Sequence, residues 1–402
     1  MNKTQAKANF QYSATQAFYW MAFCSIVNFS SNFLSEMGYS VRAVGWILAL
    51  GYFFSVFVQQ IIASISDKSK RFKTPHMILV CVAIQTILAL ALLVAKATSI
   101  AMSVIYVALI TLINSTQPLC NAIPNYLGHT TGARVNFGIG RAMGSLFFSF
   151  VSVVMGRLIT GFGIKSNVFV ITTMSVLFAV NTLWIIVSTS GKQTEADHAN
   201  VGKSSLKDYG AIINKNRWFL FILLGIVGFM FGHSIINNFL YQIMTNAGGD
   251  SASLGVMLAL CAALELPTMI FYKQLEDKFG VKKLFILVGI SFTLKCLFTA
   301  LSTNVYALYA TSFLQMLAFA IYVPASVSLV EKIMDKSEVV RGHALVTGAY
   351  TIGCLIACLS GGVIIDNLGV VASLYVSTGL AFVGLLSLVA GFVVSRKNKV
   401  MI

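Results

Sequence analysis

The segment SDKSKRFK (residues 66–73) follows the second long apolar run of this sequence, and a similar segment, EDKFGVKK (276–283), follows the eighth. Each segment places Asp-Lys and then further basic residues at the same point of its half of the chain. Internal repeats of six membrane spans are a recurring plan among membrane proteins. The two segments therefore predict two related halves of six spans each.

The composition indicates the environment of these runs. Hydrophobic residues make up 57% of the 402 residues and charged residues 10%, with a mean hydropathy of +0.83, whereas soluble domains carry about 25% charged residues. A run of about 20 apolar residues crosses a hydrocarbon core of roughly 30 Å, and a helix satisfies its own backbone groups there. We expect an all-α membrane protein with twelve transmembrane helices, at about 14–35, 43–65, 74–96, 99–127, 136–161, 167–190, 217–246, 252–275, 282–302, 304–333, 341–367 and 370–396.

The basic residues predict how these spans are oriented. Of the 28 Lys and Arg residues, 22 fall on one side of the predicted membrane, Arg141 and Lys295 remain within the spans, and the other side holds only Arg42, Lys96, Arg157 and Lys165. Lys and Arg gather in cytoplasmic loops, so we expect cytoplasmic N and C termini and a multi-pass protein of the cell membrane. The net charge of +15 follows from this asymmetry and does not imply a nucleic-acid partner.

The longest polar stretch divides the spans six and six. It predicts an N-terminal six-helix bundle at 1–190, a cytoplasmic linker loop at 191–216 and a C-terminal six-helix bundle at 217–402. All seven cysteines lie within predicted spans and none shows metal-ligand spacing, so we expect neither disulfides nor a metal site. We also expect no cofactor, the lipid bilayer as the surroundings, and a monomer.

The loop segments and the twelve spans together resemble the major facilitator superfamily, over essentially the whole chain. Asp67-Lys68 and Asp277-Lys278 match the core of that family's loop signature, although its leading glycine is missing from both copies. The resemblance implies a fold of two six-helix bundles, and it implies that these loop residues help to hold one conformation by contacting helix ends. A plain solvated turn is the alternative interpretation of the same residues.

A narrower resemblance begins at FGIGRAMGSLFF (137–148), which is similar to a segment of the lactose-permease-like and nucleoside:proton symporter-like members. Arg141 matches an arginine that contacts sugar in the lactose-permease-like proteins, and Lys295 falls where they have another arginine. Their helix X supplies a His and a Glu for proton transfer, but the matching positions here are Phe319 and Tyr322. The resemblance therefore implies a proton path different from theirs, with Tyr322 at the substrate site.

Glu265 is the only acidic residue deep within a predicted span, in LCAALELPTMIF (260–271). A charge there costs at least about 2.5–3.5 kcal/mol and needs a partner, water or a proton. Lys295, near mid-depth in the following span, is the nominated partner, and Arg141 is the other cation within the spans. If gating moved Lys295 away, Glu265 would take up a proton, which predicts a proton-coupling pair. A purely structural ion pair is the alternative.

Uncharged polar residues recur at helical spacing in three of the spans. Amide side chains both donate and accept hydrogen bonds, which suits a neutral, hydroxyl-rich ligand, although hydrogen bonds between helices also use them. A lone histidine is more often a satisfied polar residue than a proton carrier. Together with Arg141, we expect the substrate site to include Asn28, Asn121, Asn125, His233, Asn237, Asn238 and Tyr241.

These observations predict a secondary active transporter that works by alternating access, with a small-molecule substrate at mid-depth between the two halves. Proton-coupled symport of a small neutral polar solute, such as a sugar or oligosaccharide, is favoured, with the proton as the coupling ion. A nucleoside:proton symporter, an uncoupled facilitator and a drug or metabolite antiporter remain alternatives, as does a non-transporting membrane sensor or assembly protein with the same fold. No catalytic constellation indicates an enzyme.

Overall fold

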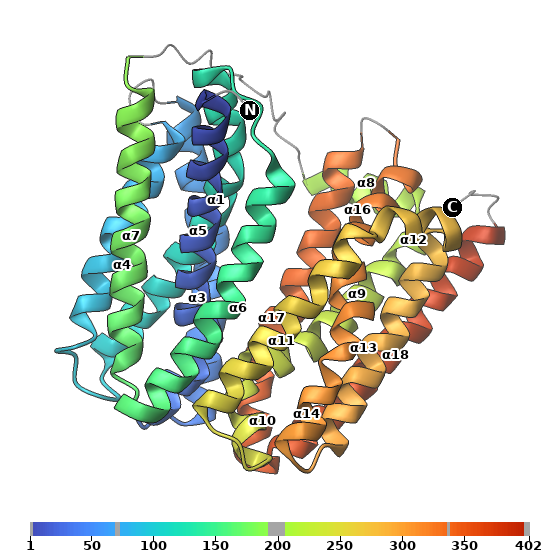
Figure 1. Cartoon of the computed structure of the whole chain (residues 1–402). Helices are drawn as coiled ribbons and strands as arrows, with labels where there is room; N and C mark the ends of the chain where they lie inside the picture. Colours follow the sequence, from blue (N-terminus) through green and yellow to red (C-terminus); the bar gives the residue numbers. More distant parts are fainter. Residues whose placement is uncertain (1–2, 69–72, 192–205, 336–337, 398–402) are drawn as a thin grey trace. The chain divides into compact units, whose positions relative to one another are not determined.

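The computed structural model describes residues 3–68, 73–191, 206–335 and 338–397, which are helical apart from short connections. They form two compact units (Figure 1). The first comprises Met1–Asn200 and Asp250–Ala262, and the second comprises Val201–Gly249 and Ala263–Ile402. The expectation of an all-α architecture is confirmed.

Eleven helical stretches of the described residues are long and apolar enough to cross a membrane. They begin with Val41–Ile62 and end with Val370–Ser395, and each coincides with one of the runs expected from residue 43 onward. Hydropathy therefore located these spans well, because each is a continuous helix or a set of short helices in which apolar residues dominate.

The first expected run, 14–35, is not one regular helix. It is divided among α1 (Lys3–Phe23), a π-helical turn η1 (Cys24–Asn28) and α2 (Ser30–Glu36). The side chains of Gln11 and Gln16 on α1 are buried among neighbouring helices, which lowers the hydropathy of this segment. A helix that is buried by its neighbours can carry such polar groups because they find hydrogen-bond partners there.

α1 lies at the centre of the first unit. It packs against α5, α6 and α7, while α4 packs against α5 and α7, and α3 packs against α5 (Figure 1). This arrangement sets polar residues of α1 against α5 and α7, where Gln16 donates to Asn121 and Gln11 donates to Ser188. The bounds of the remaining helices of the unit are α3 (Val41–Lys68), α4 (Thr74–Ala91), α5 (Ile100–Thr131), α6 (Phe137–Phe162) and α7 (Ser166–Thr189).

The first half of α11 (Ser251–Ile270) also belongs to the first unit and lies against α6. A Cβ atom placed on Gly255 would come within 2.2 Å of the carbonyl oxygen of Ser152. Small residues allow helix backbones to approach closely in membrane proteins. Any side chain at Gly255 would therefore force the two helices apart.

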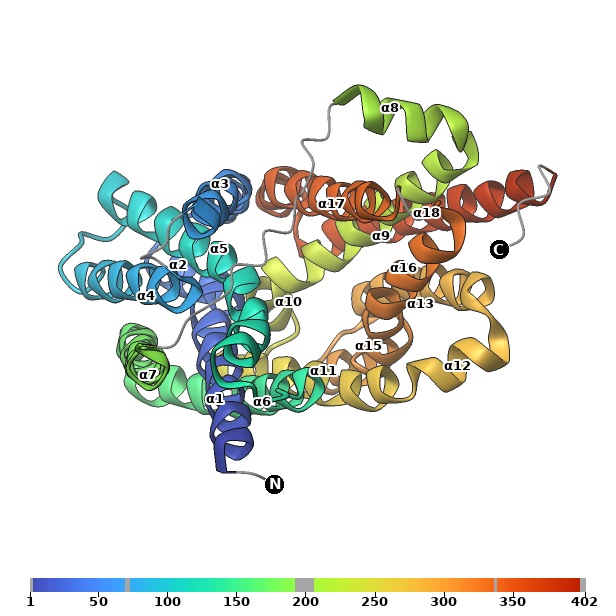
Figure 2. The ribbon, with the colours of Figure 1, turned by 90° about the horizontal axis from the view of Figure 1, so that it is seen from above.

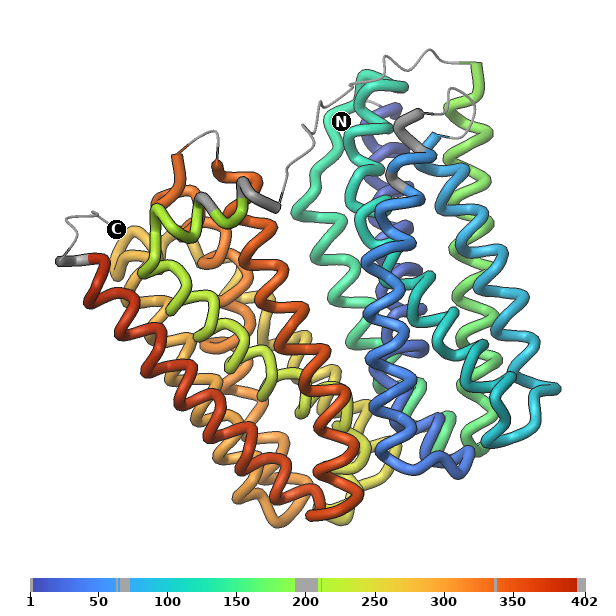
Figure 3. Tube along the Cα trace, turned by 180° about the vertical axis from the view of Figure 1, so that it is seen from behind, coloured from blue at the N-terminus to red at the C-terminus, as the bar shows by residue number. Residues whose placement is uncertain are grey.

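α9 lies at the centre of the second unit. It packs against α13, α17 and α18, and the neighbouring positions of α9, α17 and α18 are visible from above (Figure 2) and from behind (Figure 3). The bounds of the helices are α8 (Leu206–Lys215), α9 (Arg217–Asn238), α10 (Leu240–Asn246), α12 (Tyr272–Phe279), α13 (Val281–Leu301), α14 (Val305–Thr311), α15 (Phe313–Leu317), α16 (Phe319–Ile333), α17 (Val339–Leu368) and α18 (Val370–Lys397).

The expected span 304–333 is interrupted inside the second unit. Ala318 has φ −89° and ψ −91°, outside the helical range, and it separates α15 from α16. Both short helices pack against α13. Gln315 lies in the middle of α15 and Phe319 starts α16, and both helices pack against the helix that carries Lys295.

Candidate functional site

A chain of hydrogen bonds in the second unit links Lys295 on α13 to Glu265 on α11. Nζ of Lys295 donates to Oε1 of Gln315 at 2.5 Å. Nε2 of Gln315 in turn donates to Oε1 of Glu265 at 2.6 Å. From the sequence we expected the two charged groups to pair directly, and the structure places the amide of Gln315 between them.

Burial makes this chain energetically important. The exposed fraction is 1% for Lys295 and 4% for Gln315, while Glu265 is half-buried. Removing an ammonium group from water costs several kcal/mol, which only good hydrogen bonds and an opposite charge can offset. An amide suits the position because it accepts through its oxygen and donates through its nitrogen. The three side chains therefore form a polarised chain from cation to anion.

A histidine and two aromatic rings adjoin the charged chain. The His233 ring on α9 stacks on Phe319, with centroids 4.5 Å apart and planes 8° apart. Nδ2 of Asn237 lies 2.8 Å from Nε2 of His233, and the imidazole lies edge-on to Phe292 of α13, one turn before Lys295, with ring centroids 5.6 Å apart. The Tyr322 ring lies 6.3 Å from that of Phe319. His233, Asn237 and Tyr322 thus lie in one cluster with Lys295.

Two other residues expected at the substrate site lie further along the same segment. Asn238 is buried, and its Nδ2 donates to Sγ of Cys358 on α17 at 3.1 Å. One turn earlier, Ser234 donates to Sγ of Cys354 at 2.9 Å. These two contacts join α9 to α17. Tyr241 is half-buried on α10.

A second cluster lies in the first unit, around Arg141 of α6. Its guanidinium carbon is 4.2 Å from the ring centroid of Trp20 on α1, and Nη1 lies 3.4 Å from the Ser145 hydroxyl. Trp20 Nε1 donates to Oε1 of Gln16 at 3.1 Å, and Nε2 of Gln16 donates to Oδ1 of Asn121 at 3.3 Å. Arg141 and Asn121, both expected at the substrate site, thus belong to one network.

The glycine that follows Arg141 by three residues explains how α1 comes so near. A Cβ atom on Gly144 would lie 2.6 Å from Cδ1 of Trp20. Without a side chain at this position, the indole ring can lie directly against α6, beneath the guanidinium. A planar cation over an aromatic face contributes about 0.5–2 kcal/mol, so the arrangement orients both Arg141 and Trp20.

Two further asparagines of the first unit were expected at the substrate site. Asn125 is exposed on α5. Asn28 ends η1, and its buried Oδ1 accepts no hydrogen bond from the residues that the structure describes. A buried acceptor without a donor costs about 1–3 kcal/mol.

Asp277 and Lys278, which were expected to contact helix ends, make contacts within their own helix, whereas their neighbour Glu276 contacts another helix. Asp277 pairs with Lys273 on its own helix at 2.9 Å, and Nζ of Lys278 lies 5.3 Å from the Phe279 ring centroid. Glu276 is buried and binds Lys332 of α16 at 2.5 Å. The contact from this loop to another helix end is therefore made by Glu276.

The side chains of Asp67 and Lys68 lie outside the described residues. Within the described residues, no group of three or more His, Cys, Asp or Glu side chains could hold a metal ion. The charged chain and the Arg141 cluster are therefore the two arrangements that carry recognisable chemistry.

Sequence reasoning missed Gln315, Trp20 and Gln16. Gln315 was signalled only by being an amide in the middle of an apolar span, one span after Lys295. Gln16 and Trp20 are four residues apart, so they share a face of α1, but the low hydropathy of α1 does not say which helix that face meets. The partners of these residues come from helices distant in the sequence.

The comparisons with known proteins agree with this architecture. Residues 10–376 match the MFS_1 like family. A relative from Bacillus subtilis (strain 168), the uncharacterized transporter YwbF, is 26% identical over 399 residues, which cover 96% of this chain and 95% of the relative.

Solved structures share the fold over nearly the whole chain. A mutant form of the nucleoside transporter NupG matches with a TM-score of 0.81 at 15% identity, covering 96% of this chain and 99% of that chain. The POT family transporter PepTSo matches with a TM-score of 0.72 at 12% identity, covering 98% of each chain. At these identities the likeness concerns the fold alone.

Proposed function

Because this chain belongs to the MFS_1 like family and shares the fold of major facilitator transporters, we propose that it is a proton-coupled symporter of a small, neutral, polar solute. It is a multi-pass membrane transporter and not an enzyme. Within that frame, the proposal assigns proton coupling to the second unit and solute recognition to polar side chains of both units.

The observation that carries the proposal is the Lys295–Gln315–Glu265 chain. While Glu265 is ionised, Lys295 and the Gln315 amide stabilise its charge, and Glu265 compensates the buried cation. When Glu265 binds a proton, its negative charge is lost and the buried Lys295 no longer has an opposite charge nearby. This change favours a different arrangement of the three side chains. A group that is charged in one conformation and neutral in another couples proton binding to conformational change.

Solute recognition is proposed for the Arg141 cluster, together with Asn28 and Asn125. His233, Asn237 and Tyr322 of the second unit are proposed to take part as well. Asn121 and Gln16 provide amide donors and acceptors, and Trp20 provides an aromatic face. Hydroxyl-rich solutes are bound by such combinations, because amides satisfy their hydroxyl groups in both senses and apolar ring faces cover their C–H groups. We therefore propose a sugar or oligosaccharide as the first candidate.

A nucleoside is the second candidate, and the likeness to NupG favours it. NupG is a nucleoside transporter with the same fold over nearly the whole length of both chains. A nucleobase would stack on an aromatic ring such as Trp20 or Phe319, while the ribose would meet the amides. A nucleoside requires a ring on which its base can stack, whereas a sugar does not. Competition of unlabelled sugars and nucleosides for uptake of a labelled solute therefore separates the two candidates.

The orientation and mode of action complete the proposal. Both termini are proposed to be cytoplasmic because most Lys and Arg residues lie on the same side of the predicted membrane as the termini. The bacterial relative supports placement in the plasma membrane. The two units would carry out alternating access, as inferred from the repeat of the loop segments. Asp67, Lys68, Asp277 and Lys278 are proposed to help hold one conformation.

Uptake into proteoliposomes with an imposed pH gradient tests this function. Labelled sugars and nucleosides are offered to reconstituted protein, and the internal concentration is followed. We expect one solute to accumulate above its external concentration only when protons flow inward, and to be released when a protonophore is added. Entry that stops at equal concentrations with or without the gradient would indicate a facilitator, and absence of flux for every solute would contradict transport of this class.

A further inference from the structure

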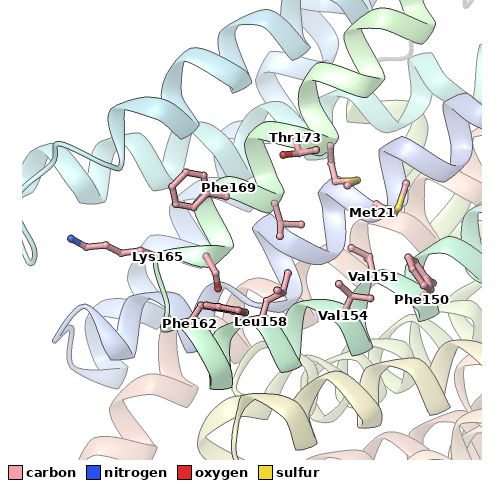
Figure 4. A pocket seen from close by; sticks show the side chains of 12 residues that line it. Met21, Phe150, Val151, Val154, Leu158, Phe162, Lys165, Phe169 and Thr173 are labelled. Atoms are coloured by element: carbon pink, nitrogen blue, oxygen red, sulfur yellow. The ribbon is translucent and has the colours of Figure 1, made fainter.

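The first unit holds a groove between α6 and α7 that the transport proposal does not use. It has a volume of about 510 Å³, and its walls are almost entirely apolar. Figure 4 shows Phe150, Val154 and Phe162 along α6, Phe169 on α7, and Met21 of α1 among the lining side chains. Phe150, Phe162 and Phe169 are more than half exposed. The groove therefore opens on the surface that contacts lipid.

The length of the groove corresponds to one leaflet of a bilayer. From Phe150 to Phe162 the lining side of α6 rises about 18 Å at roughly 1.5 Å per residue. The hydrocarbon core is roughly 30 Å thick, so a single leaflet accounts for about half of that. A groove of this length between two antiparallel helices accommodates a lipid acyl chain that runs along the membrane normal.

One end of the groove carries a cation. Lys165 lies in the connection between α6 and α7 and is exposed, and Ser166 beside it also lines the groove. In Figure 4 the Lys165 side chain extends outward from this end, away from the apolar side chains. A lysine at the end of a transmembrane helix extends its charge toward the membrane interface in this manner. The cation therefore lies where the headgroup of a lipid in the groove would lie.

We propose that this groove binds an anionic glycerophospholipid, with an acyl chain between α6 and α7 and the headgroup phosphate at Lys165. Lipid chains are as apolar as the groove walls, so hydrophobicity alone selects no particular lipid. Filling the groove with a chain restores the packing contacts that an empty groove would lose. Selection among lipids then rests on the charge at Lys165, because phosphatidylglycerol carries a net negative charge whereas the choline cation of phosphatidylcholine offsets its phosphate.

Native mass spectrometry of the purified protein tests the proposal with phosphatidylglycerol and phosphatidylcholine of identical acyl chains. We expect the wild-type protein to retain phosphatidylglycerol about fivefold more than phosphatidylcholine, the factor that one lysine near an anionic headgroup supplies. Lys165→Gln should bring the two adducts to equal intensity, and Lys165→Arg should restore the preference. Lys96→Gln is the matched control, because Lys96 lies in another loop of the same unit and does not line the groove; it should keep the preference.

A second variant tests the acyl-chain part of the proposal independently of charge. Val154→Trp fills the groove at its middle, so it should reduce the adducts of both lipids. The unfolding temperature of each variant in lipid-free detergent, compared with that of the wild type, confirms that the protein is folded. Equal retention of both lipids by the wild type, an unchanged preference in Lys165→Gln, or undiminished adducts in folded Val154→Trp would each overturn the proposal.

Discussion

Gln315 donates a hydrogen bond from Nε2 to Oε1 of Glu265 at 2.6 Å. Through this bond a deep carboxylate is tied to a residue whose other end accepts from the buried Lys295. The amide cannot shift toward one charged group without weakening its bond to the other. The proposed coupling of proton and solute therefore depends on Gln315 as well as on the two ions.

Replacing Gln315 with Leu should uncouple transport and destabilise the protein. The substitution keeps an apolar volume in place but leaves Lys295 without its acceptor, and hydrogen bonds to charged groups are worth about 1.5–3 kcal/mol. We expect proton-driven accumulation to fall more than solute exchange, as measured in the same proteoliposomes.

Thr311→Val is the matched control for this experiment. Thr311 is buried in the same expected span, and its hydroxyl donates to the carbonyl oxygen of Leu308. The variant removes a buried hydroxyl group from the same span but leaves the Lys295–Gln315–Glu265 hydrogen bonds in place. The ratio of accumulation to exchange should therefore remain that of the wild type. If Gln315→Leu kept that ratio too, Gln315 would have no part in coupling.

Arg141→Lys should weaken solute binding. The ammonium group keeps the charge but loses the planar stacking of the guanidinium on Trp20. Because such stacking is worth about 0.5–2 kcal/mol, the KM for exchange should rise by roughly twofold to thirtyfold. Arg157→Lys on the same helix is the control, since Arg157 is exposed, and its KM should stay unchanged. Equal KM values for wild type and Arg141→Lys would contradict a role in recognition.

Two adjacent acidic residues of α12 should differ sharply in their effect on stability. The Glu276 side chain is 5% exposed and binds Lys332, which is 47% exposed, whereas Asp277 pairs with Lys273 at the surface. Glu276→Gln should lower the free energy of unfolding by about 2–3 kcal/mol, toward the low end for a buried pair because Lys332 is partly solvated. Asp277→Asn should cost less than about 1 kcal/mol. The reverse order of unfolding temperatures would refute the role given to Glu276.

Asp250 should make stability depend on acid pH. Its carboxylate accepts hydrogen bonds from the Ser253 amide and hydroxyl, at 2.9 and 2.8 Å, at the start of α11. Burial on its own would raise the pKa of Asp250, but these bonds and one from Thr160 outweigh burial and hold the pKa below its ordinary value of 3.8. The ionised carboxylate of Asp250 therefore adds to the free energy of unfolding above pH 3.8. This stabilisation is lost as the pH falls through the lowered pKa of Asp250.

The variant Asp250→Asn isolates this effect. Asparagine is as good an N-cap as aspartate, so the variant loses only the favourable charge at the helix N-terminus, about 0.3–1 kcal/mol. Its unfolding temperature should be below that of the wild type near neutral pH, and the two should converge in strong acid. A constant difference at every pH would exclude Asp250 as the titrating group.

The sequence was sufficient for the parts of the fold that follow from local apolarity. Spans from residue 41 onward were located because lipid demands continuous apolar helices. The segment 14–35 was located but not its π-helical turn, because the backbone there responds to neighbouring helices. Glu265, Lys295 and Arg141 stood out as charges in apolar spans. Gln315 and Trp20 did not, because an amide or an indole in a span is common and only tertiary contacts show what it meets.

Transport by the Glu265→Gln variant tests the central claim most directly. The amide is similar in shape to the carboxylate and can still bond to Gln315, but it cannot bind or release a proton in the cycle. Uptake driven by a pH gradient and exchange of labelled for unlabelled solute are measured in parallel on the same proteoliposomes. We predict that the variant retains exchange and loses accumulation against a gradient. Proton-driven accumulation equal to that of the wild type would contradict the assignment of coupling to Glu265.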